Sequence, residues 1–244
     1  MRPAIFHSRR EIAAALSTRT GGVSPMPLGM NTSYSVGDEK ENVEKNRELL
    51  VGGHGIGLAE LASPQQVHSS TVRRVTEPGV YPECDALITD TPRVFLTVSH
   101  ADCVPILLYS PAARAVAGIH AGWKGTASEI ALVALRAMEE EFGSSPGDTL
   151  AFLGPAAGVC CYQVGEDVAS RFDKRFVRGA KGTLYVDLKR SNLDQLCGAG
   201  VSVQKIEVSP YCTICRPDLF HSYRRDRDKS GRMMAVIGLK SRLS

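Results

Sequence analysis

Long apolar runs and dense blocks of one charge are both missing from this 244-residue sequence. No apolar stretch approaches the roughly 18 residues that a membrane-spanning helix needs, so we expect no membrane partner. The net charge of +3 is small and no dense Lys/Arg block is present, which argues against nucleic acid as a partner. The first residues lack the apolar core of a secretory signal, so a cytoplasmic location is expected.

Nucleotide-binding fingerprints are missing as well. The sequence contains neither Gly-x-x-x-x-Gly-Lys-Ser/Thr nor Gly-x-Gly-x-x-Gly. The glycine-rich residues 52–57 follow a predicted helix instead of a strand, and we interpret them as a loop. An anionic ligand would therefore be bound by separate arginines, for which the candidates are Arg19, Arg47 and either Arg224 or Arg225.

Histidine is scarce, and this bears on copper. The chain has six histidines, and none of them forms a His-x-His pair of the kind that multicopper oxidases use. A blue-copper centre needs His, Cys and a weak axial Met, and no Met lies close in sequence to Cys103 or His120. The ligand count therefore argues against copper oxidation.

Cysteine is present in an odd number, seven, and the start of the chain does not resemble a signal peptide. We therefore expect reduced thiols and no disulfide framework. We interpret the Cys160-Cys161 pair as packing residues. We interpret Cys212-x-x-Cys215 as an incidental dithiol, because no second pair of this spacing accompanies it.

The order of the predicted elements indicates the fold class. Strands and helices interleave, yet several strands follow each other directly, which favours an α+β fold with mixed sheets and flanking helices. Prolines and glycines are scattered and form no linker, so we predict one domain over residues 1–244. We predict strands at 3–7, 67–75, 84–89, 94–99, 104–109, 115–120, 150–153, 184–186, 201–208 and 233–239, and helices at 39–51, 126–142, 166–176 and 188–197, whereas residues 11–16 fit either type.

Three side chains near strand ends have the chemistry of a metal site. Cys103 lies between two predicted strands, His120 ends a third, and His68 is near the start of another. One thiolate and two imidazoles suit zinc, and three protein ligands leave a fourth position for water or substrate. Zinc would lower the pKa of a bound water to about 7. Two alternatives stay open: a buried cysteine with two unrelated histidines, or a Cys103 thiolate–imidazole nucleophile.

Charged residues beside apolar segments supply further candidates. Arg47 shares the apolar face of the predicted helix 39–51, where an arginine either reaches solvent or meets an anion. Asp102 adjoins Cys103, and Asp85 and Glu166 also lie at the ends of apolar segments. Each of these carboxylates could transfer a proton or simply cap an element.

Several sequence blocks are more specific than single residues. The most specific are Ala101-Asp102-Cys103-Val104-Pro105 and His120-Ala121-Gly122-Trp123-Lys124-Gly125, accompanied by Gln66-Val67-His68 and Ser222-Tyr223-Arg224-Arg225-Asp226. Taken together, these blocks resemble the laccase-domain family, also called polyphenol-oxidase-like or YfiH-type, whose members are described as zinc-dependent purine nucleoside phosphorylases. The resemblance covers nearly the whole chain. His100 and His221 depart from the family pattern, and neither is a proposed ligand.

The resemblance implies an activity and a set of site residues. It implies zinc on His68, Cys103 and His120, with Arg47 and Asn31 near phosphate or ribose. Phosphate would attack C1′ of inosine, guanosine, adenosine or methylthioadenosine as the purine leaves. Adenosine deamination would be a side activity, in which zinc activates water and a carboxylate such as Asp102 carries the proton. The small-molecule partners would be a purine nucleoside and phosphate, and the oligomeric state stays open.

Other functions remain open at this point. The chain could be a cytoplasmic zinc amidase that edits peptidoglycan precursors, a role also attached to some family members. It could be a polyphenol oxidase, as the older family label says. It could also be a binding domain that zinc stabilises without catalysis. Metal analysis combined with phosphorolysis assays separates these alternatives.

Overall fold

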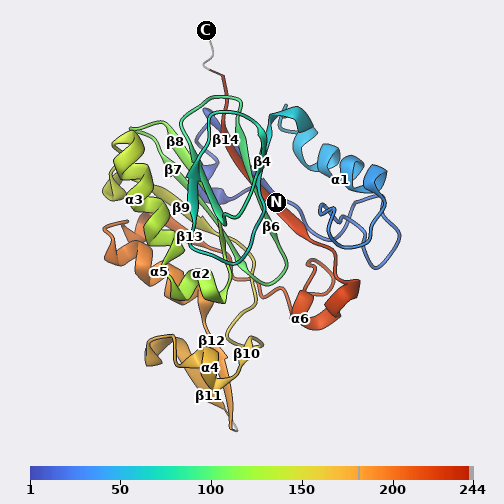
Figure 1. Cartoon of the computed structure of the whole chain (residues 1–244), viewed down its shortest axis with the longest axis vertical. Helices are drawn as coiled ribbons and strands as arrows, with labels where there is room; N and C mark the ends of the chain where they lie inside the picture. The colour runs from blue at the N-terminus through green and yellow to red at the C-terminus, as the bar shows by residue number, and fades with distance from the viewer. Residues whose placement is uncertain (181, 242–244) are drawn as a thin grey trace.

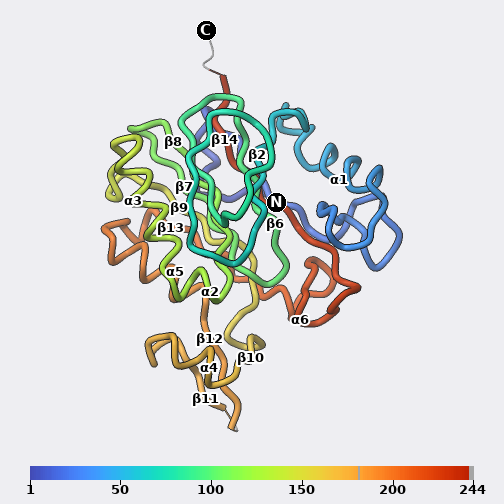
Figure 2. Tube along the Cα trace, in the orientation of Figure 1, coloured from blue at the N-terminus to red at the C-terminus, as the bar shows by residue number. Residues whose placement is uncertain are grey.

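The computed structural model describes residues 1–180 and 182–241. Two large β-sheets pack face to face, and helices cover both outer faces (Figures 1 and 2). The helices are α1 (Lys40–Gly52), α2 (Trp123–Ala127), α3 (Ile130–Phe142), α4 (Glu166–Ala169), α5 (Leu188–Gly198) and α6 (Tyr223–Asp226).

Both large sheets are mixed. The first has the order β1-β14-β6-β2-β4, from β1 (Ile12–Leu16), β14 (Met233–Leu239), β6 (Phe95–His100), β2 (Leu61–Pro64) and β4 (Gly79–Tyr81). The second has the order β13-β9-β7-β8-β5-β3, from β13 (Ile206–Val208), β9 (Leu150–Leu153), β7 (Val104–Ser110), β8 (Ala115–Ala121), β5 (Ala86–Thr89) and β3 (Val72–Arg74). The α+β prediction of mixed sheets with flanking helices is confirmed.

Alternation along the central strands explains the layers. Leu107 of β7 faces the space between the two sheets, whereas its neighbours Ile106 and Leu108 face α3 and α5. Successive side chains of a strand point to opposite faces, so an uninterrupted apolar run is buried on both sides. On the outer face of the first sheet, Val236 of β14 packs in the cluster that includes Val51 of α1. The layer order is therefore helix, sheet, sheet, helix.

A third, small sheet lies apart from these layers at the bottom of Figure 1. It has the order β10-β12-β11, from β10 (Gln163–Val164), β12 (Thr183–Val186) and β11 (Val177–Ala180). The single helix predicted at 166–176 is wrong, because the chain forms the short α4 and then a 3-10 turn at Lys174–Phe176. The carboxylate of Asp173 accepts a hydrogen bond from Arg175 N–H and starts that turn.

Four other boundaries differ from the prediction. Residues 3–7, predicted as a strand, instead contain a 3-10 turn, Ala4–Phe6, closed by the hydrogen bond from Phe6 N–H to Pro3 O. The strand predicted at 67–75 is confined to β3, because the N–H groups of residues 67–69 donate hydrogen bonds to the Asp85 side chain. The helix predicted at 126–142 begins at Ile130, since Glu129 has φ +57° and breaks it from α2. The strand predicted at 201–208 is confined to β13.

Among the residues that the structure describes, no helix combines the length and apolar character needed to cross a bilayer.

The packing between the sheets gives a stability prediction. Leu107 is fully buried there, and Leu107→Ala should lower the free energy of unfolding by about 2–5 kcal/mol through lost contacts and a cavity. The matched control is Leu49→Ala on α1, where the side chain is 49% exposed. That change should cost less than about 0.5 kcal/mol. Urea unfolding measures both values, and equal losses would contradict the assigned layers.

Candidate functional site

One buried carboxylate, Asp85, connects two separate parts of the site. Its Oδ1 accepts hydrogen bonds from His68 N–H at 3.0 Å and from Nδ1 of His120 at 2.8 Å. Its Oδ2 accepts from Ser69 N–H at 2.6 Å, from the Ser69 hydroxyl at 2.8 Å and from Val67 N–H at 3.2 Å. The side chain thus fixes a turn and an imidazole ring at the same time.

This turn explains why no strand forms at its predicted start. Three successive N–H groups, those of residues 67–69, point at Asp85 and cannot join a sheet ladder. His68 has φ +61°, in the left-handed region that few residues other than glycine adopt. Such a conformation costs on the order of 1–3 kcal/mol, and the hydrogen bonds to Asp85 offset it.

The same donors determine the charge of Asp85. Burial raises the pKa of its carboxyl, but hydrogen bonds from His120 and Ser69 lower it by more, to about 2. Asp85 is therefore ionised near neutral pH and holds a proton on Nδ1 of His120. A carboxylate behind an imidazole in this way directs the other ring nitrogen, Nε2, toward a metal.

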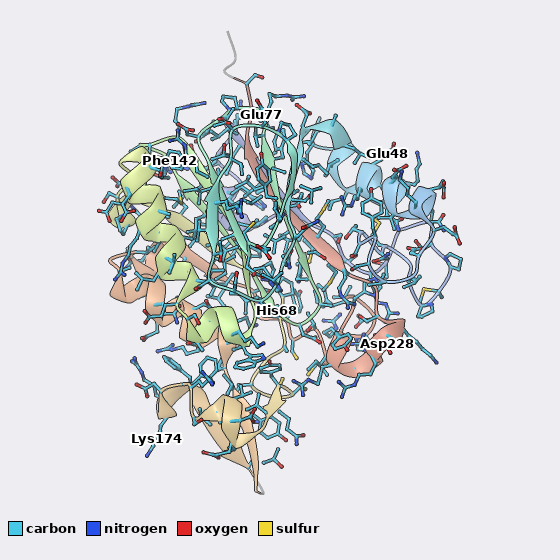
Figure 3. The ribbon with its side chains drawn as sticks, in the orientation of Figure 1. Glu48, His68, Glu77, Phe142, Lys174 and Asp228 are labelled. Carbon is cyan, nitrogen blue, oxygen red and sulfur yellow. The ribbon has the colours of Figure 1, made fainter. Side chains whose placement is uncertain are left out.

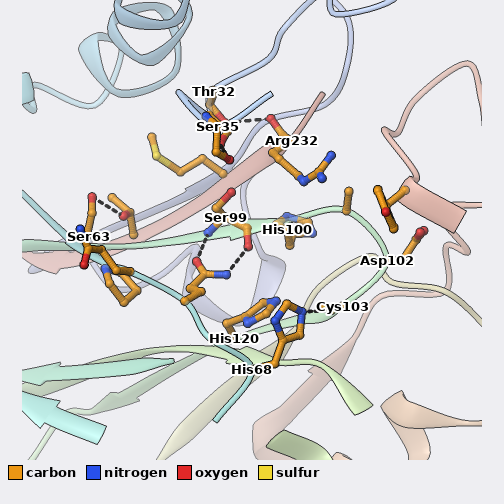
Figure 4. A pocket seen from close by; sticks show the side chains of 18 of the residues that line it. Thr32, Ser35, Ser63, His68, Ser99, His100, Asp102, Cys103, His120 and Arg232 are labelled. Atoms are coloured by element: carbon orange, nitrogen blue, oxygen red, sulfur yellow. Dashed lines mark hydrogen bonds between the residues drawn. The ribbon is translucent and has the colours of Figure 1, made fainter. Parts of the chain in front are cut away.

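His68, Cys103 and His120 present their ligand atoms to one point at the end of the sheets. Figure 3 shows His68 at the lower end of the main body, and Figure 4 shows it beside His120 and Cys103. The three ligand atoms all lie within 4.8 Å of one another, with Sγ of Cys103 3.9 Å from Nε2 of His68. No other His, Cys, Asp or Glu of the described residues joins this group.

Charge in this group favours a cation. Burial raises the pKa of the Cys103 thiol, but His120 lowers it by more, to about 6. Burial lowers the pKa of His120, but Cys103 and Asp85 raise it to about 9. Each side chain therefore favours the charged form of the other, and a metal ion could replace the proton on Nε2 of His120. The same pair is what the alternative of a cysteine nucleophile requires.

The spacing of the donors fits a zinc-sized ion. With Zn–S near 2.3 Å and Zn–N near 2.0 Å, a tetrahedral ion separates sulfur and nitrogen by roughly 3.5 Å. The observed 3.9 Å between Cys103 Sγ and His68 Nε2 is within a few tenths of an ångström of that value. Gly122 keeps the space clear, since a Cβ there would lie 3.0 Å from Cys103 Sγ and 3.0 Å from His68 Cδ2.

A pocket of about 1000 Å³ opens beside these three side chains. Its opposite wall comes from the loop that includes Thr32 and Ser35 and from Arg232, which precedes β14 (Figure 4). Pockets of this size hold small-molecule ligands. The aromatic residues that line it are Tyr34, Trp123, Tyr162 and Tyr223, together with the histidines of the site.

Three arginines line the pocket: Arg47, Arg224 and Arg232. Nε of Arg47 donates to Thr32 O at 2.7 Å, and its guanidinium carbon lies 4.4 Å from the centre of the Tyr34 ring. Burial lowers the pKa of Arg47, and no carboxylate of the described residues forms an ion pair with it. The pocket therefore carries positive charge suited to an anionic ligand.

The other two arginines are also held at the pocket wall. Arg232 donates through Nη1 to Ser230 O at 2.7 Å and packs over the ring of Tyr223. Arg224 packs over the ring of Tyr162. Sequence reasoning missed Arg232, because it lies in a charged turn where nothing in the pattern distinguishes it from a surface residue.

His100 is a polar side chain of the pocket with no partner inside the protein. It ends β6, is 2% exposed and lines the pocket. Neither ring nitrogen has a hydrogen-bond partner among the described residues. Burial lowers its pKa to about 3, so the ring is neutral near pH 7. A neutral imidazole offers one donor and one acceptor to a ligand.

Asp102 adjoins Cys103 but points away from it (Figure 4). Its Oδ1 accepts from the Thr213 hydroxyl at 2.6 Å. Its Oδ2 accepts from the Ser222 hydroxyl at 3.0 Å and from Arg224 N–H at 2.6 Å. These contacts favour a role in positioning α6, and proton transfer by Asp102 stays a prediction.

The structure gives Asn31 a different place from the one expected for a substrate contact. Its side chain is 0% exposed and is not among the residues that line the pocket. Its amide nitrogen donates to Ser33 O and Asp38 Oδ2, and its oxygen accepts from Ser33 N–H and Arg232 N–H. With its hydrogen-bonding groups engaged inside the protein, Asn31 supports the pocket wall from behind.

The remaining candidates lie outside the pocket or are occupied. Arg19 donates to the carbonyls of Pro217 and Pro27, and so joins two loops. Arg225 is held by Asp226 and by several backbone carbonyls. Glu166 is exposed at the start of α4. None of the three lines the pocket.

Comparison with known proteins shows the relationship of the whole chain. Residues 13–240 match the family model described as multi-copper polyphenol oxidoreductase laccase. The chain is 40% identical to a purine nucleoside phosphorylase of Deinococcus radiodurans, over 93% of this chain and 89% of that protein. It is 34% identical to purine nucleoside phosphorylase YlmD of Bacillus subtilis, over 96% of this chain and 90% of that protein.

Solved structures agree with the fold. The crystal structure of YlmD from Geobacillus stearothermophilus superposes with a TM-score of 0.91 at 34% identity, covering 98% of this chain and 94% of that one. The crystal structure of the Bacillus licheniformis protein YfiH superposes with a TM-score of 0.90 at 35% identity, covering 94% and 93%. The layers described above are thus those of its relatives.

The role of Asp85 predicts the effect of its replacement. Asp85→Asn keeps the size of the side chain but removes the charge that orients His120 and holds the turn at His68. We expect affinity for zinc to fall about 10- to 100-fold, with circular dichroism unchanged. Competition with a chromophoric chelator measures the affinity. Asp90→Asn, at an exposed carboxylate just beyond β5, is the control and should bind as wild type does.

The clearance at Gly122 gives a second prediction. Gly122→Ala places a methyl group against Cys103 Sγ and His68 Cδ2, so the donors must move apart by a few tenths of an ångström. Zinc binding should weaken in the same chelator competition. Gly198→Ala, where an added Cβ meets nothing within 4 Å, is the matched control. Unchanged affinity in Gly122→Ala would show that the metal is held elsewhere.

Proposed function

The chain belongs to the multi-copper polyphenol oxidoreductase laccase family, and from this premise we propose that it is a zinc-dependent purine nucleoside phosphorylase. The observation that carries the proposal is the meeting of an open three-donor group, His68, Cys103 and His120, with a pocket lined by three arginines. Relatives named purine nucleoside phosphorylase at 34% and 40% identity support it.

In this reaction an oxygen of phosphate attacks C1′ of the nucleoside. The bond between C1′ and the purine nitrogen breaks, and the purine leaves with the electron pair and takes up a proton. The products are ribose 1-phosphate and the free base. The protein must therefore hold an anion beside the ribose and support the departing base.

Arg47 is the residue best placed to hold phosphate. Its Nε is fixed by Thr32 O, so its terminal nitrogens remain for the pocket. A partly desolvated guanidinium without a carboxylate partner gains most when an anion arrives. Arg224 and Arg232 line the same pocket and add to the positive charge that concentrates phosphate there.

Aromatic rings and His100 suit the nucleoside. Tyr34, Trp123, Tyr162 and Tyr223 offer flat apolar surfaces on which a purine can stack. The unpartnered ring of His100 can exchange a hydrogen bond with a ribose hydroxyl or with the base. We propose inosine, guanosine, adenosine and methylthioadenosine as substrates, because all four share the purine ring and the ribose hydroxyls that these side chains can contact.

His68, Cys103 and His120 would hold the zinc ion. The chemistry that bound zinc supplies is Lewis-acid polarisation of an oxygen of phosphate or substrate. Asp85 keeps His120 in the required tautomer and His68 in the required turn. With a hydrolytic metal beside a nucleoside pocket, we also propose adenosine deaminase side activity, in which water replaces the amino group at C6 and ammonia leaves.

The test is phosphate-dependent release of hypoxanthine from inosine by the zinc-loaded protein. Arg47→Ala should raise KM for phosphate about 10- to 100-fold and leave KM for inosine nearly unchanged, because a charge-assisted contact of about 1.5–3 kcal/mol is lost. Arg136→Ala, at an exposed arginine on α3, should behave as wild type does. Loss of release in Cys103→Ala links the activity to the metal group.

Other outcomes of these assays would favour one of the alternative activities. Absence of hypoxanthine release, or release that needs no phosphate, would contradict phosphorolysis. Phosphate-independent hydrolysis of a peptidoglycan precursor would identify an amidase. Copper binding together with oxygen-dependent oxidation of a phenol would identify an oxidase.

A further inference from the structure

Four cysteines that the sequence pattern does not connect gather at a second place. Sγ atoms of Cys160, Cys161, Cys212 and Cys215 all lie within 4.8 Å of one another. Cys215 Sγ is 3.5 Å from Cys160 Sγ and 3.3 Å from Cys161 Sγ. None of the four is in a disulfide. The sequence analysis interpreted one pair as packing residues and the other as an incidental dithiol, and the structure brings the two pairs together.

Two loops bring the pairs together. The residues after β9 lead to Cys160 and Cys161, and the residues after β13 lead to Cys212 and Cys215. Strands β9 and β13 are parallel neighbours, so both loops begin at the same end of the second sheet, where the two strands have their carboxyl ends. A bridge between Ala156 and Cys212 continues this pairing beyond the strands, and Thr213 N–H donates to Ala156 O at 3.0 Å.

The surroundings of Cys212 suit a thiolate. Gly158 N–H donates to Cys212 Sγ at 3.2 Å. A backbone N–H that points at a sulfur stabilises the thiolate, which is the form that binds metal. The Lys189 ammonium donates to the carbonyls of Ser209 and Tyr211, at 2.7 and 3.1 Å, so it places positive charge beside this loop.

The distances distinguish a metal site from a disulfide. A disulfide needs sulfurs about 2.05 Å apart, and the observed separations are well above that value. Four thiolates about 2.3 Å from one tetrahedral ion are separated by roughly 3.8 Å, which is close to the observed spacing. A cluster of several irons would need the sulfurs farther apart. Tetrahedral coordination by sulfur alone is typical of zinc.

We propose that Cys160, Cys161, Cys212 and Cys215 bind a second metal ion of the zinc class, separate from the group at His68. Four protein ligands close the coordination sphere, so this ion is structural and not catalytic. It does not depend on the proposed phosphorylase activity. Crowded sulfurs that would repel one another as thiolates become a stable set when a divalent cation lies between them.

The four cysteines lie next to residues that form or support the pocket wall. Tyr162, next to Cys161, lines the pocket, and Thr213, next to Cys212, donates to Asp102 beside Cys103. Arg225 Nη1 donates to Thr213 O at 2.8 Å and Ile214 O at 3.2 Å. An ion on the four sulfurs would therefore fasten together two loops that form one wall of the pocket.

The experiment counts and identifies the metal in full-length protein purified with reductant and without chelator. Wild type should contain two zinc ions per chain, and Cys103→Ser should contain one. X-ray absorption at the zinc edge of Cys103→Ser should show sulfur ligands only, near 2.3 Å, because only the four-cysteine site remains. The spectrum of wild type should show sulfur and nitrogen ligands together.

Variants of the cluster complete the test. Cys160→Ser, at an exposed position, should lose one zinc ion and lower the melting temperature. Cys197→Ser, at a cysteine outside both groups, is the matched control and should keep two ions. An ion count in Cys160→Ser equal to that of wild type, oxidation of the four thiols to disulfides in the reduced preparation, or nitrogen ligands in Cys103→Ser would overturn the proposal.

Discussion

The hydrogen bonds of the Asp85 carboxylate are the constraint on which the site depends. They join a turn in the left-handed conformation at His68 to the imidazole of His120 near the end of β8, two segments that the chain order keeps far apart. Because the carboxylate is ionised and buried, it can hold both segments without a competing water. The ligand geometry is therefore set by the protein before any ion arrives, which lowers the cost of binding one.

The layered fold supplies the rest of the site. Cys103 directly precedes β7, and His120 lies on the neighbouring strand β8, so the second sheet fixes their separation. The loop before α1 and the start of β14 form the opposite wall, where Arg47 and Arg232 add positive charge. The three candidate ligands thus come from the second sheet and the turn at His68, and Arg47 and Arg232 come from the other side of the pocket. This separation is what the proposed reaction requires, in which one pocket holds phosphate and a nucleoside together.

The sequence predicted the parts of this arrangement that local pattern controls. Apolar runs located β6, β7, β8 and β14 to within a residue or two, because their side chains are buried on both faces. The helical spacing of Arg47 with Val43 and Leu50 also predicted its half-buried place. The roles of Asp85 and the four cysteines were not predictable in this way, since they depend on contacts between loops distant in sequence. His68 was assigned to a strand for the same reason, because the acceptor of its N–H lies 17 residues later.

The most direct test of the central claim is a crystal structure of the zinc-loaded protein with anomalous data at the zinc edge. We predict a peak within about 2.0–2.3 Å of His68 Nε2, Cys103 Sγ and His120 Nε2, with its fourth position open to the pocket. Asp85 should keep its hydrogen bond to Nδ1 of His120. A peak that is absent from these three atoms, or one closed by a fourth protein ligand, would contradict the account.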